Sequence, residues 1–90
     1  MITVPLVRMA GVLVTALIDE TDKPTTDSPG RIDSITIALD PGVAIQFSLT
    51  NPSGQSRDVN VAGPHNQTYT VPGAARFRRT SWAWSIQVVR

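Results

Sequence analysis

Cysteine is absent from this chain of 90 residues, and histidine, lysine and glutamate each occur once, as His65, Lys23 and Glu20. Without cysteine the chain has no disulfide, no thiolate zinc site and no cysteine nucleophile, and one histidine cannot form a histidine cluster. Helical proteins are usually rich in Glu, Lys, Ala and Leu. The scarcity of two of these residue types therefore disfavours a helical fold.

Charged side chains are also few and unevenly divided along the chain. They make up 17% of the residues, against about 25% in a typical globular domain. Residues 1–45 have a net charge of −3 and residues 46–90 a net charge of +4, which together give the total of +1. A nucleic-acid-binding module is normally far more basic overall. The opposed halves instead favour attraction within one fold or between neighbouring copies.

The chain does contain a recurring alternation of apolar and polar residues, which is the pattern of a β-strand with one buried face. It covers residues 34–40, 43–50, 57–62, 67–71 and 82–89. Segments rich in Pro and Gly separate these runs, at residues 40–42, 51–54, 63–66 and 72–73. The segment 40–42 predicts either a hairpin or a corner between two sheets. The segment 63–66 predicts a turn that places His65 at the surface.

The alternation also predicts which side chains form the core. They are Ile35, Ile37, Leu39, Val43, Ile45, Phe47, Leu49, Val59, Val61, Tyr69, Val71, Trp82, Trp84, Ile86 and Val88.

The N-terminal third predicts two further strands and a loop. Pro5 cannot donate a backbone hydrogen bond, so residues 2–7 are expected to form an edge strand or a bend. The nearly uncharged run at 11–18 predicts a strand buried on both faces. It lacks a signal-peptide cleavage site and is shorter than the roughly 20 apolar residues of a membrane helix. Residues 19–30 are charged and predict a long exposed loop.

Together these patterns predict an all-β fold, a small single-domain antiparallel β-sandwich or barrel of six to seven short strands over residues 1–90. A domain near this length buries only about 60% of the surface that its unfolded chain exposes. Because the chain has neither a disulfide nor an evident metal site, we expect a partner surface or oligomerisation to add stability.

Two charged clusters are the candidate interaction residues. The acidic cluster comprises Asp19, Glu20 and Asp22, and the arginine cluster comprises Arg76, Arg78 and Arg79. The carboxylates do not have EF-hand spacing, so we predict no metal site. The arginine guanidinium binds carboxylates through two parallel hydrogen bonds. We therefore expect the arginine cluster of one copy to contact the acidic cluster of another.

The remaining residues give no sign of catalysis. His65 has no nucleophile motif beside it, and the glycines do not form a phosphate-binding loop. Trp82 and Trp84 fall on the same strand face as Ile86 and Val88, which predicts a place in the core. We therefore expect a protein that is not an enzyme and that uses no cofactor.

Short, cysteine-free β-domains rich in Thr, Ser and Pro, with an apolar first strand, resemble small accessory proteins of virus particles. The resemblance implies a structural protein of a phage or virus particle, such as a capsid decoration, cement or connector subunit, that acts by subunit adhesion. Its partners would be other copies of itself or a major capsid or tail protein, without a membrane. It would be made in the host cytoplasm without a signal peptide and end in the virion.

Two other functions are compatible with the same residues. A carbohydrate-binding or adhesion β-sandwich would use Tyr69, Trp82 and Trp84 as an exposed stacking platform. A single-stranded nucleic-acid binder would combine the arginine cluster with neighbouring aromatic rings. The arginines would attract phosphates, and the rings would stack on bases.

Replacing the arginine cluster tests the predicted contact between copies. The triple variant Arg76→Ser, Arg78→Ser, Arg79→Ser is expected to fold normally but to assemble poorly. Leaving a desolvated carboxylate unpaired costs the assembly roughly 2–5 kcal/mol. Exposed pairs would cost far less. Sedimentation at low and physiological salt measures the change. Unchanged assembly together with lost binding to single-stranded DNA would contradict the prediction.

Overall fold

The alternating residues form β-strands in the computed structural model, which describes residues 1–19, 31–73 and 81–89. The strands are β1 (Ile2–Met9), β2 (Val12–Asp19), β3 (Arg31–Leu39), β4 (Ala44–Thr50), β5 (Ser56–Ala62), β6 (His65–Thr70) and β7 (Ala83–Val89). No α-helix occurs in these ranges, and hence none that is long and apolar enough to cross a membrane. The predicted all-β class is confirmed.

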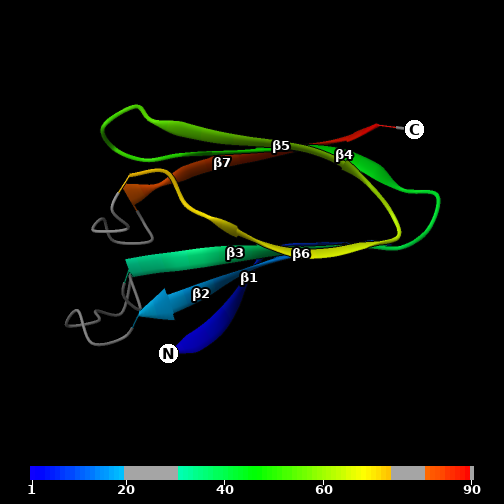
Figure 1. The fold of residues 1–90 in the computed structure, drawn as a ribbon, viewed down its shortest axis with the longest axis horizontal. Coiled ribbons are helices and arrows are strands. Elements are labelled where there is room, and N and C mark those ends of the chain that lie inside the picture. The colour runs from blue at the N-terminus through cyan, green and yellow to red at the C-terminus, as the bar shows by residue number, and fades with distance from the viewer. Residues whose placement is uncertain (20–30, 74–80, 90) are drawn as a thin grey trace.

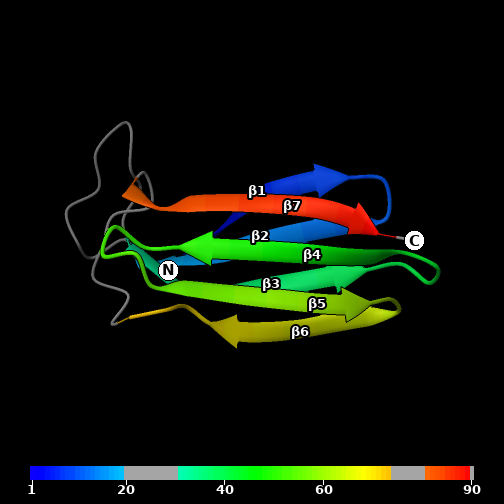
Figure 2. The same ribbon diagram turned by 90° about the horizontal axis from the view of Figure 1, so that it is seen from above.

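The strands form two antiparallel sheets that lie face to face. One sheet has the strand order β1-β2-β3-β6 and the other the order β5-β4-β7. Figure 1 shows the sheets as two layers, and Figure 2 shows that the strands of both layers follow the same long axis. The architecture is therefore a β-sandwich, as the strand pattern predicts.

The core lies between the two sheets and contains most of the residues predicted for it. Phe47 and Leu49 of β4 are almost completely buried, and so are Ile35 and Ile37 of β3. The buried apolar side chains of the described residues are Val12, Val14, Ala16, Ile18, Ile32, Ile35, Ile37, Leu39, Ile45, Phe47, Leu49, Val59, Val71 and Trp82. Nearly all come from alternate strand positions, because successive side chains of a strand point to opposite faces.

The two N-terminal strands follow the prediction only in part. β1 pairs with β2 alone in the described structure, and its register shifts between Pro5 and Val7, so both an edge strand and a bend are present. The expectation that residues 11–18 are buried on both faces is wrong. Leu13 is exposed and Leu17 half-buried on the outer face of the four-stranded sheet, while only the alternate residues reach the core.

β3 to β6 form one long antiparallel ribbon that folds from one sheet into the other. β4 pairs with β5 from Thr50↔Ser56 to Ala44↔Ala62, and β3 pairs with β6 from Leu39↔His65 to Ser34↔Thr70. Between these two sections, residues 40–43 lie opposite only Gly63 and Pro64. Because four residues on one side of the ribbon lie opposite two on the other, the ribbon bends at this point. Residues 40–42 therefore form a corner between sheets and not a hairpin.

The position of His65 next to the corner differs from the prediction. The turn predicted over residues 63–66 is confined to Gly63 and Pro64, because His65 already pairs with Leu39 as the first residue of β6. His65 is half-buried and not fully at the surface.

Hydrogen bonds between backbone groups hold the corner together. The Gly63 N–H donates to the Val43 carbonyl (2.7 Å), and the Asp40 N–H donates to the Gly11 carbonyl (3.0 Å) in the turn between β1 and β2. Gly63 lies so close to Asp40 that a Cβ atom at this position would overlap the Asp40 carbonyl oxygen. Only glycine fits here.

The hairpin turn between β4 and β5 is organised by Asn51, the one buried polar residue in the described ranges. Its Oδ1 accepts hydrogen bonds from the backbone N–H groups of Ser53 (2.9 Å) and Gln55 (3.1 Å). Its Nδ2 donates to Gln55 Oε1 (3.0 Å) and to the Pro72 carbonyl (3.4 Å). The side chain thus closes the predicted turn at 51–54 and ties it to the segment that follows β6.

Substituting Gly63 tests how tightly the corner is packed. Gly63→Ala is expected to reduce the free energy of unfolding by about 3 kcal/mol, because the added methyl group has to displace backbone. Gly42→Ala is the control: Gly42 has φ of +86° but nothing within 4 Å of its Cβ position, so only about 1 kcal/mol is expected. Urea denaturation measures both values, and equal losses would contradict the role assigned to the Gly63 contact.

Candidate functional site

The two predicted charged clusters fall largely outside the described residues. Residues 76–79 lie outside them, and so do Glu20, Asp22 and the rest of the predicted loop at 19–30 apart from Asp19. Asp19 is the last residue of β2, where it lies opposite Arg31 in the register. The Arg31 Nη2 atom is 3.5 Å from Asp19 Oδ2, so this carboxylate has a partner within its own chain. Its contact with a neighbouring copy stays a prediction.

The aromatic residues lie mainly on the inner sides of the sheets. Trp82 is buried, which confirms its predicted place in the core, whereas Trp84 is half-buried at the rim of the core. Tyr69 belongs to β6 in the other sheet and is half-buried as well. These three rings therefore do not form the exposed stacking platform considered from the sequence.

The flank of the sandwich between β5 and β6, here called the closed flank, is covered by polar and aromatic side chains. The Arg57 guanidinium carbon lies 5.5 Å from the centroid of the Tyr69 ring, and its Nη1 donates to Thr70 Oγ1 (3.4 Å). His65 stacks on Tyr69 at 6.0 Å, and His65 Nε2 is 2.7 Å from the Tyr69 hydroxyl. Because β5 and β6 belong to different sheets, the two Arg57 contacts join the layers, whereas His65 and Tyr69 contact each other within β6.

The flank between β1 and β7, here called the open flank, is apolar and incompletely covered. Figure 2 shows both edge strands on the same side of the molecule. Ile2, Met9 and Val88 lie opposite the buried residues Ile18, Val12 and Ile45, and therefore point toward the interior.

These three side chains are nevertheless exposed, by 38%, 46% and 40%. Between them lie the half-buried side chains of Val4, Val7, Trp84 and Ile86. The predicted core position of Val88 is thus only partly correct: the residue points inward, but no described strand covers it.

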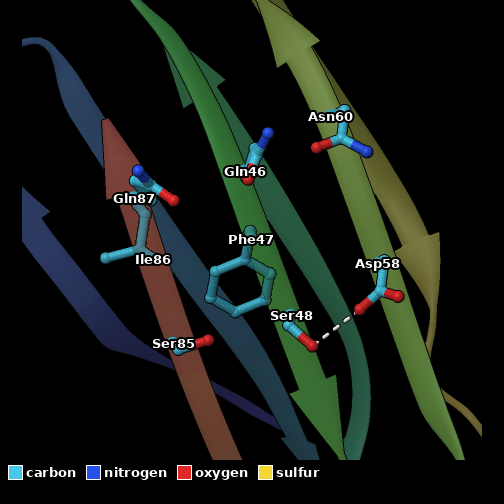
Figure 3. Close-up of a pocket in the computed structure, with 8 residues that line it drawn as sticks. All are labelled: Gln46, Phe47, Ser48, Asp58, Asn60, Ser85, Ile86 and Gln87. Carbon is cyan, nitrogen blue, oxygen red and sulfur yellow. Dashed lines mark hydrogen bonds between the residues drawn. The ribbon is translucent and has the colours of Figure 1, made fainter. Parts of the chain in front are cut away.

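A third surface, here called the polar trough, lies on the outer face of the three-stranded sheet. Figure 3 shows its side chains in two rows across β7, β4 and β5. The amide row is formed by Gln87, Gln46 and Asn60. The second row is formed by the hydroxyls of Ser85 and Ser48 and the carboxylate of Asp58. They line a hollow of about 470 Å³.

The two rows differ in how far their hydrogen-bonding groups are used. Ser48 Oγ donates to Asp58 Oδ1 (2.6 Å), a contact drawn in Figure 3. The three amide side chains make no hydrogen bond to any other residue that the structure describes. Sequence reasoning assigned all of these residues to solvent-facing strand positions. Only the pairing register brings them together.

Neither metal-binding side chains nor similarity to known proteins assigns a function to the chain. Within residues 1–19, 31–73 and 81–89, no three His, Asp or Glu side chains gather where they could hold a metal ion. No family model, curated protein or solved structure matches the chain.

The Tyr69 hydroxyl provides a test of the closed flank. Tyr69→Phe is expected to lower the free energy of unfolding by about 1 kcal/mol, because the half-buried His65 loses its hydrogen-bond partner. Thr68→Val on the same strand is the control, since it removes a hydroxyl whose only hydrogen bond to a described side chain is the exposed one with Thr36. Thermal unfolding measures both. A loss for Tyr69→Phe no larger than that for Thr68→Val would show that the flank does not depend on this contact.

Proposed function

We propose that the chain is a non-enzymatic structural subunit of a large assembly, which adheres to further copies of itself through the open flank. The observation that carries this proposal is the exposure of Ile2, Met9 and Val88, which point inward between the sheets but are covered by none of the described strands. Contiguous apolar surface of this kind marks interaction sites in proteins.

The geometry of the open flank supports a contact between strands. β1 and β7 each pair on one side only in the described structure, so the other side of each strand presents backbone donors and acceptors. A neighbouring strand would satisfy these groups and bury the apolar side chains, at roughly 25 cal/mol for each Å² of apolar surface removed from water. Pro5 removes one donor from β1 and restricts the register in which pairing can occur.

A second copy is the partner that fits this flank best. The flank carries one edge strand from each sheet, so a copy related by a two-fold axis presents the same two edges and the same apolar side chains. The proposed arginine–carboxylate contacts would then fix the orientation of the copies. A phage or virus particle is the setting that we propose for such a subunit, on the basis of its composition.

Adjacent valines at the end of β7 allow a matched test. Val88 points into the open flank and Val89 points to the outer face, while their exposed fractions are nearly equal at 40% and 38%. Val88→Lys is expected to weaken self-association by about tenfold or more, because it places a charge in the apolar contact. Val89→Lys adds the same charge and is expected to leave self-association unchanged. Sedimentation equilibrium over a range of concentrations measures both variants.

Two results would contradict the proposal. The first is a wild-type chain that remains monomeric at every concentration tested. The second is an equal loss of self-association in both lysine variants, which would assign the contact to another surface.

A further inference from the structure

We infer that the polar trough binds a neutral oligosaccharide. This inference goes beyond the proposed subunit contact and does not rest on it, because the trough lies on the outer face of the three-stranded sheet whereas the open flank runs between the two sheets. It also differs from a stacking platform, since it uses amide and hydroxyl groups and none of the three rings considered from the sequence.

The trough is longer than the hollow in Figure 3 alone. A second hollow, of about 270 Å³, shares Gln46 and Asn60 with the first and extends toward Ala62 and Val89. A third hollow, of about 120 Å³, shares Ser48 and Ser85 with the first. Because they share these residues, the three hollows lie next to one another on the outer face of the sheet.

The hydrogen-bonding groups of the trough match sugar hydroxyls. Each carboxamide offers two N–H donors and one carbonyl acceptor, and the Asp58 carboxylate keeps acceptor capacity beyond its bond to Ser48. Neighbouring strands are about 4.8 Å apart, so the amide row spans about 10 Å from Gln87 to Asn60. This span is comparable with the length of a disaccharide. Because the amides have no partner in the described chain, a ligand displaces only water from them.

The charge and the apolar border of the trough narrow the class of ligand. Of the residues that the structure describes, Asp58 is the only charged one that lines the trough and none is a lysine or arginine, so this lining repels phosphate and sulfate groups. Beside the amide row lies a row of short apolar side chains, formed by Ala62, Ala44 and Val89. Sugar rings present apolar C–H surfaces as well as hydroxyls, and this row provides a surface for them.

Side-chain amide signals in NMR spectra report on the trough directly. The full chain, labelled with ¹⁵N, is titrated with short neutral oligosaccharides built from glucose, mannose, galactose or N-acetylglucosamine. We expect the NH₂ signals of Gln46, Asn60 and Gln87 to shift with at least one of these, while the Asn66 signal stays in place. Asn66 is a suitable reference because it is an exposed asparagine on β6, in the other sheet.

The two asparagines also provide matched variants. Asn60→Ala is expected to weaken binding by about tenfold, and Asn66→Ala to leave it unchanged. The inference is overturned if no oligosaccharide of the series shifts the three amide signals, or if both alanine variants bind equally well. It is also overturned if a sulfated oligosaccharide binds the trough more tightly than its neutral counterpart. Shifts of the amide signals that depend on protein concentration alone would assign the trough to a second copy and overturn it too.

Discussion

The close approach of Gly63 to the Asp40 carbonyl is the contact on which the sandwich depends. It lets the ribbon formed by β3 to β6 fold sharply enough for its two sections to lie in different sheets. The remaining strands are then attached to this ribbon, β2 to β3 and β7 to β4. The bond from Asp40 to Gly11 brings the turn between β1 and β2 to the same corner. A single backbone contact therefore determines how both layers are placed.

The folded ribbon also explains why the two flanks of the sandwich differ. On one side the chain passes directly from β5 to β6, and Arg57, His65 and Tyr69 cover the gap between the sheets. On the other side β1 and β7 come from the two ends of the chain, and no described strand connects them. The first flank is held by polar and aromatic contacts within the chain, whereas the second leaves apolar side chains exposed.

The sequence predicts the strands and the core well, because alternation is a local property that each strand displays by itself. Ile35, Ile37, Phe47 and Leu49 are identified in this way. What alternation cannot predict is pairing. The contact of Arg57 with Tyr69 depends on the corner at Gly63, and the amide row of the polar trough depends on strand register. Neither can be read from a single segment of the sequence. The run at 11–18 misleads because leucine occupies the outer positions 13 and 17 of β2, while Val, Ala and Ile occupy the inner ones.

Asn51 has a chemical consequence beyond its hydrogen bonds. Asparagine residues undergo slow deamidation, in which the backbone nitrogen of the next residue attacks the side-chain amide and forms a cyclic intermediate. Hydrolysis of this intermediate leaves a carboxylate in place of the amide. Here the next residue is Pro52, whose nitrogen carries no hydrogen and cannot form that cyclic intermediate. The buried amide that ties the β4–β5 turn to Pro72 is therefore protected from the slow reaction that would place a negative charge beside two carbonyl oxygens.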